Sequence, residues 1–255
     1  MKKQHEVYAL ETTASAGQIK SRNNLKELFE ASPLPKDDLL FNVGLYTRSS
    51  VLVKFLVMYE LYQRFLNVPG VLVEFGTWWG QNLVLLENLR AILEPFNKQR
   101  KIIGFDTFAG YASSTTKDGD SEFFKEGSYA TTQDYQAYLD SLIREHEGSN
   151  VLGHVSGVHQ LVKGDVTQTA PSYFAKSPET LVAFAYFDMG LYEPTKAALL
   201  SIKPHLVSGS IILLDELTWP ESPGEALAFK EVFSPSEYRI EKVQLYPSKT
   251  IITIK

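Results

Sequence analysis

Cysteine is absent from the 255 residues of this chain. Its absence excludes disulfide frameworks, thiolate zinc sites and cysteine nucleophiles, and a reducing cytoplasm is the expected compartment. The sequence also lacks a run of about 18 apolar residues, the length that a membrane-spanning helix needs. Polar residues follow the lysines at positions 2 and 3, where a secretory signal would have a stretch of about 7–15 apolar residues. We therefore expect neither a membrane anchor nor a secretory signal.

Basic residues are outnumbered by acidic residues. The chain has 25 lysines and arginines against 30 aspartates and glutamates, for a net charge of −5. No basic stripe is available to displace the counterions of a nucleic acid or an anionic membrane, so neither partner is expected. The hydrophobic content of 44% and aromatic content of 12% are those of an ordinary folded protein. The length fits one large α/β domain.

The first quarter of the chain is predicted to be helical. Leucine and phenylalanine recur at helical spacing in residues 23–31, and a longer helix with one apolar face is expected over residues 49–67. Residues 1–20 are polar and aperiodic and are expected to form a mobile arm or loop. We therefore predict an N-terminal arm and helical cap over residues 1–67, within the same domain as residues 68–255.

After residue 67 the pattern changes to short apolar strands that alternate with helices. The predicted helices are 82–93, 132–146, 194–202 and 224–233, and the predicted strands are 71–75, 101–106, 160–164, 181–188, 210–215, 238–245 and 250–254. Four residues join the last two strands, too few for a parallel crossover, so these strands must form an antiparallel hairpin. A mostly parallel seven-stranded sheet with such a hairpin is the Rossmann-like α/β fold of class I methyltransferases, whereas dehydrogenase sheets usually stay parallel.

The turn after the first strand is the first candidate for cofactor binding. Its glycines lie four residues apart, so it is not the GxGxxG motif that holds a pyrophosphate. Glycine nonetheless allows the backbone to approach a ligand at the start of a helix. A structural strand-to-helix turn is the alternative. The cofactor candidates in this segment are Glu74, Gly76, Thr77, Trp78 and Gly80.

Two further carboxylates follow the next strands. Asp106 ends the second strand, where a carboxylate can accept hydrogen bonds from both hydroxyls of an adenosine ribose. The alternative role for Asp106 is a helix N-cap. Asp165 follows the third strand and could accept from the adenine amino group, or it could be a turn residue.

The ends of the fourth and fifth strands complete a recognisable set of motifs. They are Tyr186-Phe187-Asp188-Met189-Gly190 and Leu213-Leu214-Asp215-Glu216. Together with Glu74-Phe75-Gly76-Thr77-Trp78-Trp79-Gly80 and Gly104-Phe105-Asp106-Thr107-Phe108, they resemble the macrocin O-methyltransferase family. Its better-known members methylate sugar hydroxyls of macrolide and aminocoumarin antibiotics. The likeness extends from about residue 44 to residue 235.

The resemblance implies an enzyme that uses S-adenosylmethionine and Mg²⁺ to methylate a hydroxyl of a small molecule, with a sugar or a glycosylated natural product as the expected acceptor. It implies that Asp188, Asp215 and Glu216 hold the metal. A bound cation lowers the pKa of an acceptor hydroxyl, and Asp188 is the best candidate to take its proton. Two positions depart from the family, which commonly has aspartate at the positions of Glu216 and Gly190. A solvated strand end is the alternative for Asp215-Glu216.

Other functions remain open at this point. A nicotinamide-dependent oxidoreductase has the same general fold, although the missing third glycine and the hairpin disfavour it. A cofactor-binding module without catalysis is suggested by Glu216 and Gly190. Analogy alone suggests a homodimer.

Several other residues are weaker candidates. The acidic loop over residues 118–126 is expected to be a flexible lid rather than an ion site. Tyr46, Arg48, Trp78 and Trp79 could line the acceptor pocket. The histidines at positions 154, 159 and 205 lack metal-ligand spacing and are expected to be surface or capping residues.

Overall fold

The structure is a computed structural model that describes residues 14–111, 114–119, 124–151 and 158–255. The chain divides into two compact units, one up to Leu52 and one from Val53 onward. No helix in these described ranges is both long enough and apolar enough to cross a bilayer. The predicted division at residues 67 and 68 remains a prediction.

The N-terminal unit consists of short helices. They are α2 (Ala16–Glu30), α3 (Lys36–Phe41), the 3₁₀ helix η1 (Val43–Tyr46) and the start of α4 (Ser49–Phe65). Helix α2 begins well before the predicted residue 23, because Ser15 and Gln18 form a capping box. The expectation of an irregular segment is therefore wrong from Ala16 onward, and residues 1–13 lie outside the described residues. The short helix α3 was not predicted.

The second unit is built on a seven-stranded sheet of order β3-β2-β1-β4-β5-β7-β6. Strands β1 to β5 are parallel, and β7 is antiparallel to both β5 and β6. This confirms the predicted class I methyltransferase fold with its C-terminal hairpin. The strands are β1 (Val71–Phe75), β2 (Ile102–Asp106), β3 (Gln160–Lys163), β4 (Val182–Phe187), β5 (Leu206–Leu214), β6 (Tyr238–Lys242) and β7 (Thr250–Ile254).

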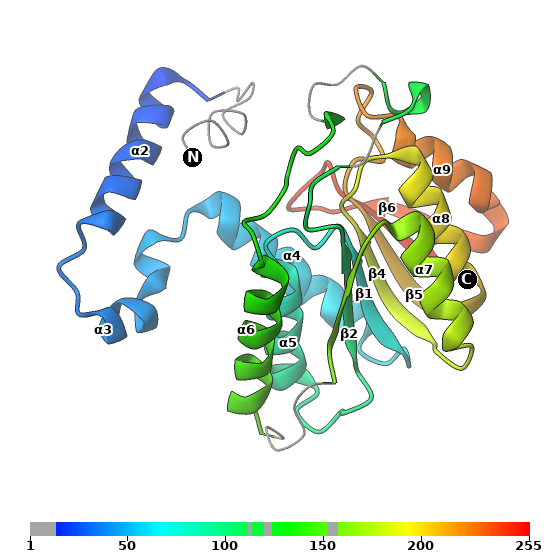
Figure 1. The fold of residues 1–255 in the computed structure, drawn as a ribbon, viewed down its shortest axis with the longest axis horizontal. Helices are drawn as coiled ribbons and strands as arrows, with labels where there is room; N and C mark the ends of the chain where they lie inside the picture. The colour runs from blue at the N-terminus through cyan, green and yellow to red at the C-terminus, as the bar shows by residue number, and fades with distance from the viewer. Residues whose placement is uncertain (1–13, 112–113, 120–123, 152–157) are drawn as a thin grey trace. The chain divides into compact units, whose positions relative to one another are not determined.

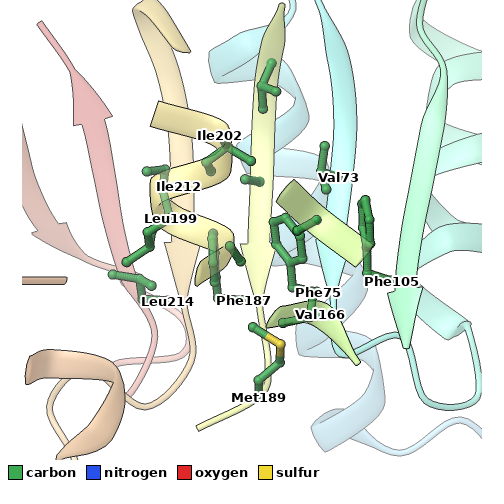
Figure 2. Packing of buried hydrophobic residues seen from close by; sticks show 14 of the residues in the cluster. Val73, Phe75, Phe105, Val166, Phe187, Met189, Leu199, Ile202, Ile212 and Leu214 are labelled. Carbon is green, nitrogen blue, oxygen red and sulfur yellow. The ribbon is translucent and has the colours of Figure 1, made fainter. Parts of the chain in front are cut away.

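Helices cover both faces of the sheet (Figure 1). One buried cluster joins the sheet to α5 (Gln81–Leu93), α6 (Tyr135–Ser149) and the later part of α4. The other joins it to α7 (Val166–Lys176), α8 (Tyr192–Ile202) and α9 (Gly224–Val232). Figure 2 shows the second cluster, in which Phe75 and Phe187 from adjacent strands lie beside Val166 of α7. Because successive side chains of a strand face opposite ways, each apolar strand contributes to both clusters.

Some element boundaries differ from the prediction. Helix α7 was not predicted, and it carries Pro171 in its interior. Strand β5 begins at Leu206, four residues before the predicted start, and β6 ends at Lys242, three residues before the predicted end. Three short 3₁₀ segments complete the described elements: η2 (Thr116–Asp118), η4 (Lys203–His205) and η5 (Pro235–Glu237).

Two histidines expected at the surface or in caps are buried. His159 bonds to Glu87 of α5, and His205 contacts the carbonyl oxygen of Thr180 through Nδ1 at 2.7 Å. Tertiary packing thus overrides the prediction for both, and His154 lies outside the described residues.

The order of the strands reverses next to β1. The chain builds β2 and β3 on one side of β1 and then places β4 on its other side. The carboxyl ends of β1 and β4 are neighbours there, with Phe75 opposite Phe187. Ligands of open α/β sheets bind at this kind of reversal.

Candidate active site

The glycine turn after β1 lies directly against the end of β4. Gly76 has φ of +91°, and a Cβ atom at this position would collide with the carbonyl oxygen of Asp188. The Asp188 amide also donates to the carbonyl oxygen of Phe75 at 2.9 Å. Gly80, with φ of +74°, is the N-cap residue of α5, and a side chain there would collide with Leu139. Both glycines are therefore required for the tight approach of these segments.

Asp106 connects the turns after β1 and β2. Its carboxylate accepts hydrogen bonds from the backbone amides of Trp78 at 2.7 Å and Phe108 at 2.5 Å. Burial raises the pKa of this carboxyl, whereas the amide hydrogen bonds oppose that rise. Both amide donors belong to residues with positive φ, 47° for Trp78 and 55° for Phe108. Asp106 therefore stabilises two strained turns at the carboxyl edge of the sheet.

The other two carboxylates of the predicted cofactor set differ in their surroundings. Glu74 is buried in β1 and accepts from Asn82 Nδ2 at 2.8 Å through Oε1, while its Oε2 has no hydrogen-bond partner in the described part of the chain. Burial raises the pKa of Glu74, and the nearby charges of Asp188 and Asp106 raise it further. Asp165 is exposed and caps α7 by accepting from the Thr167 amide at 2.9 Å. Asp165 is thus the N-cap of α7, and its proposed contact with adenine remains a prediction.

The three predicted metal ligands come together at the ends of β4 and β5. Asp188, Asp215 and Glu216 each offer a carboxylate oxygen, and these oxygens all lie within 4.8 Å of one another. Burial raises the pKa of Asp188 to about 7, and the neighbouring charge of Asp215 adds to the rise. Three carboxylates held this closely repel one another, and either protonation or a bound cation relieves the repulsion.

Two residues that the sequence analysis missed bind this group. The hydroxyl of Tyr186 lies 3.1 Å from Asp188 Oδ2 and 3.2 Å from Asp215 Oδ2. Lys249 bonds directly to Asp215 Oδ1 and donates to the Tyr186 hydroxyl at 2.7 Å. The alternation of β4 places Tyr186 on the same face as Asp188 and could have identified it. The position of Lys249 near this group depends on the register of the C-terminal hairpin, so the local sequence did not identify it.

A fourth carboxylate, Glu225 of α9, was also missed. It is fully buried, and its Oε2 accepts from the backbone amide of Glu216 at 3.1 Å. Burial raises the pKa of Glu216 well above its ordinary value, and the neighbouring charge of Glu225 contributes. Glu225 therefore fixes the backbone at the third predicted ligand and places a further buried carboxyl group beside it.

The group suits a hard divalent cation. Carboxylate oxygens are the ligands that Mg²⁺ prefers. Glu216 Oε2 and Glu225 Oε1 are buried and have no hydrogen-bond partner among the residues that the structure describes. Unpaired buried carboxylate oxygens are costly, and a cation would satisfy them. Asp188, Asp215 and Glu216 would hold the ion.

Aromatic side chains lie beside the glycine turn. The Trp78 ring packs against Trp79 and Tyr129, with ring centroids 5.5 and 5.7 Å apart. Trp79 is 36% exposed, which is compatible with the predicted wall of an acceptor pocket. Tyr46, in the N-terminal unit, packs against Phe29 of the same unit. Arg48 also belongs to that unit, and its predicted role, like that of Tyr46, remains a prediction.

The expectation of a flexible lid is wrong at Asp118. This residue is buried, and its Oδ1 accepts from the backbone amide of Tyr192 at the start of α8 at 2.5 Å. Its Oδ2 accepts from the amide of Thr115 at 2.6 Å. Asp118 thus anchors the segment to α8. Asp120 and Glu122 of the same loop lie outside the described residues.

Comparisons with known proteins agree with this architecture. A model of the methyltransferase domain family matches residues 73–217. One similar structure is the crystal structure of CalS11, a calicheamicin methyltransferase. Its sequence is 37% identical to this chain, the TM-score is 0.91, and the alignment covers 95% of this chain and 94% of that chain. A second is the apo structure of CalS11, described as a TDP-rhamnose 3′-O-methyltransferase of calicheamicin biosynthesis. Its sequence is 36% identical, the TM-score is 0.82, and the alignment covers 95% of this chain and 96% of that chain.

A more distant structure shares the fold. The O-methyltransferase NovP is 16% identical with a TM-score of 0.61, over 80% of each chain. None of the curated proteins is significantly similar to this chain in sequence. The family match and the identity to CalS11 rule against the nicotinamide oxidoreductase considered above. The chain belongs to the methyltransferase domain family, and it is an S-adenosylmethionine-dependent O-methyltransferase.

Proposed function

We propose that this enzyme methylates a sugar hydroxyl of a small molecule, either a nucleotide-linked sugar or a glycosylated natural product, and that it requires Mg²⁺. The identity to CalS11 supports a sugar acceptor, because CalS11 is described as acting on TDP-rhamnose. The motifs shared with the macrocin O-methyltransferase family support the same acceptor class.

The cofactor is proposed to bind at the reversal point beside β1. Gly76, Thr77, Trp78 and Gly80 bring backbone close to it, and Asp106 accepts from the ribose hydroxyls. The buried carboxylate of Glu74 has one oxygen without a partner among the described residues, which supports a contact with a cationic group such as the amino group of the methionine moiety. Asp165 is proposed to accept from the adenine amino group.

The acidic centre is proposed to prepare the acceptor. A divalent cation held by Asp188, Asp215 and Glu216 would lower the pKa of a nearby sugar hydroxyl. Asp188 takes the proton of that hydroxyl, and the oxygen then attacks the methyl carbon of the sulfonium. The carbon–sulfur bond breaks as the carbon–oxygen bond forms, and S-adenosylhomocysteine leaves. Holding the oxygen in line with the methyl group supplies much of the rate enhancement.

The observation that carries this proposal is the convergence of three carboxylates within 4.8 Å, at the strand ends beside the glycine turn. The test is methyl transfer from S-adenosylmethionine to a panel of nucleotide-linked sugars, glycosides and phenols. Mass spectrometry of the products would be done with Mg²⁺ and after chelation. We expect methylated sugars only when Mg²⁺ is present.

Variants separate the metal site from general damage. Asp188→Asn should abolish turnover and leave the affinity for S-adenosylhomocysteine nearly unchanged, as measured by calorimetry. Asp140→Asn, on the exposed face of α6, is the matched control and should retain activity. Full turnover in the presence of a chelator would contradict the metal requirement, and preferred methylation of phenols would contradict the sugar acceptor.

A further inference from the structure

The C-terminal hairpin brings a lysine to the acidic centre. Strands β5 and β7 pair with Leu214 opposite Thr250, and Asp215 and Lys249 are the residues next to this last pair. The turn between β6 and β7 fixes the Lys249 backbone, because its amide donates to Tyr246 at 3.0 Å and its carbonyl oxygen accepts from Val243 at 2.9 Å. The register of the hairpin therefore brings this lysine to the tip of β5, where it bonds to Asp215.

The ammonium group of Lys249 is buried and held on several sides. The residue is 6% exposed, and its Nζ bonds to Asp215 Oδ1 and to the hydroxyl of Tyr186. The rings of Tyr186 and Tyr246 also lie close to it, with centroids 5.0 and 5.1 Å from Nζ. A buried ammonium is stable only when a negative partner compensates its lost hydration. Asp215 is that partner.

Carboxyl groups outnumber the single ammonium of Lys249 in this region. Asp188, Asp215, Glu216 and Glu225 lie here, and Lys249 is the cationic side chain that bonds to Asp215. Two of their oxygens have no hydrogen-bond partner in the described part of the chain. The lysine thus pairs with one carboxylate and leaves the other carboxyl oxygens available to a second cation.

We propose that Lys249 is an internal counter-ion of the acidic centre, which stabilises the metal-free protein and competes with a divalent cation for Asp215. The proposal rests on the metal site of the proposed function. An ammonium bonded to Asp215 repels a divalent cation that binds the same carboxylate. Lys249 therefore sets the affinity of the site for metal. It is a positioning residue, because it acts through Asp215.

The test compares Lys249→Met with wild type and uses Mn²⁺ as the probe. Binding of Mn²⁺ is measured by electron paramagnetic resonance on protein without cofactor or acceptor. We expect Lys249→Met to bind Mn²⁺ at least about tenfold more tightly than wild type. Its melting temperature without metal should fall by roughly 5 °C or more and should recover when Mn²⁺ is added.

Two further variants keep the experiment decisive. Lys249→Arg retains the charge and should bind Mn²⁺ about as wild type does. Lys242→Met removes an exposed lysine from the same hairpin and should change neither quantity. If Lys249→Met folds only when it is purified with Mg²⁺, that dependence supports the proposal. If the variant fails to fold both with and without Mg²⁺, the result contradicts the proposal.

Unchanged or weaker Mn²⁺ binding by Lys249→Met would overturn the proposal, including the case in which neither protein binds Mn²⁺. The methyl-transfer assay on wild-type protein is separate from this comparison. Metal-dependent turnover together with unchanged Mn²⁺ affinity would refute the counter-ion and leave the proposed function intact. Metal-independent turnover together with tighter Mn²⁺ binding by the variant would refute the metal requirement and support the counter-ion.

Discussion

Gly190 shows how two departures from the related sequences fit together. It has φ of +64°, and a Cβ atom built on it would lie 2.5 Å from the Phe124 ring and 3.3 Å from Glu216 Oε2. The space that a side chain at position 190 would need is therefore filled by an aromatic ring and by the longer carboxylate arm at position 216. The glutamate and the glycine are complementary, which favours a working acidic centre over a degraded one.

Gly190→Ala should therefore lower the free energy of unfolding by more than the backbone conformation of this residue alone predicts. Gly127 is the matched control, because it has φ of +77° but no atom within 4 Å of a built Cβ. Both alanine variants strain the backbone by about 1–2 kcal/mol. We expect Gly190→Ala to lose a further 1–3 kcal/mol or so, as overpacking typically costs. Urea denaturation measures both, and equal losses would contradict the steric argument.

Sequence patterns identified the three clustered carboxylates better than the residues around them. Asp188, Asp215 and Glu216 each follow a buried apolar strand, and parallel strands bring their carboxyl ends to one edge. Lys249 and Glu225 could not be found in this way. The first depends on the pairing register of a hairpin, and the second on how α9 packs, and neither leaves a pattern in the local sequence.

A buried ionic cluster joins α5 to the edge of the sheet. Glu87 accepts two hydrogen bonds of 2.7 Å from Arg90 on the next turn of α5. The Ile102 amide donates to Nδ1 of His159 at 3.0 Å, so Nε2 carries the proton and donates to Glu87 at 2.7 Å. Glu87 therefore connects a helix to the start of β2 and to the segment before β3.

Glu87→Gln should destabilise the protein in a pH-dependent manner. Burial acts to raise the pKa of Glu87, but hydrogen bonds from Arg90 and His159 outweigh it and lower the pKa from 4.5 to about 2. A lowered carboxyl pKa stabilises the folded state above the unfolded value, and this contribution is lost as the pH falls from about 4.5 through about 2. At pH 7 the loss should be on the order of 3 kcal/mol.

Urea denaturation at several pH values checks this expectation. The difference between wild type and Glu87→Gln should shrink as the solution becomes more acidic below about pH 4.5. Glu145→Gln, on the exposed face of α6, should change stability by less than about 0.5 kcal/mol. A difference that stays constant down to about pH 2 would show that the cluster acts without the charge of Glu87.

Helices and strands with a clear hydrophobic pattern were predicted best from the sequence. The buried strands and the long helices were found because apolar runs and helical periodicity mark them. Helix α7 was missed because it is short and Pro171 interrupts its pattern, yet Asp165 caps it and Ala170 and Phe174 pack into the core. Tertiary packing, which a local pattern does not show, stabilises such a helix.

At the scale of the whole chain, the two units differ in what they bury. Helices α2, α3 and η1 contain no buried residue, and Phe41 of α3 is 94% exposed. All of the candidate cofactor and metal residues lie in the second unit, which also contains both buried clusters. We therefore expect the core and the candidate cofactor site to form without the first helices.

Deletion of residues 1–48 should consequently leave a folded protein that binds cofactor. We expect a cooperative melting transition within about 4 °C of the full chain, since little core is removed. The affinity for S-adenosylhomocysteine, measured by calorimetry, should change by less than about threefold, which is under 1 kcal/mol. The full chain carrying Gly76→Ala is the contrasting control and should lose cofactor binding, because the added Cβ collides with the Asp188 backbone. If the shortened protein lost its cooperative transition or its cofactor affinity, the N-terminal helices would have to be counted as part of the core that supports the site.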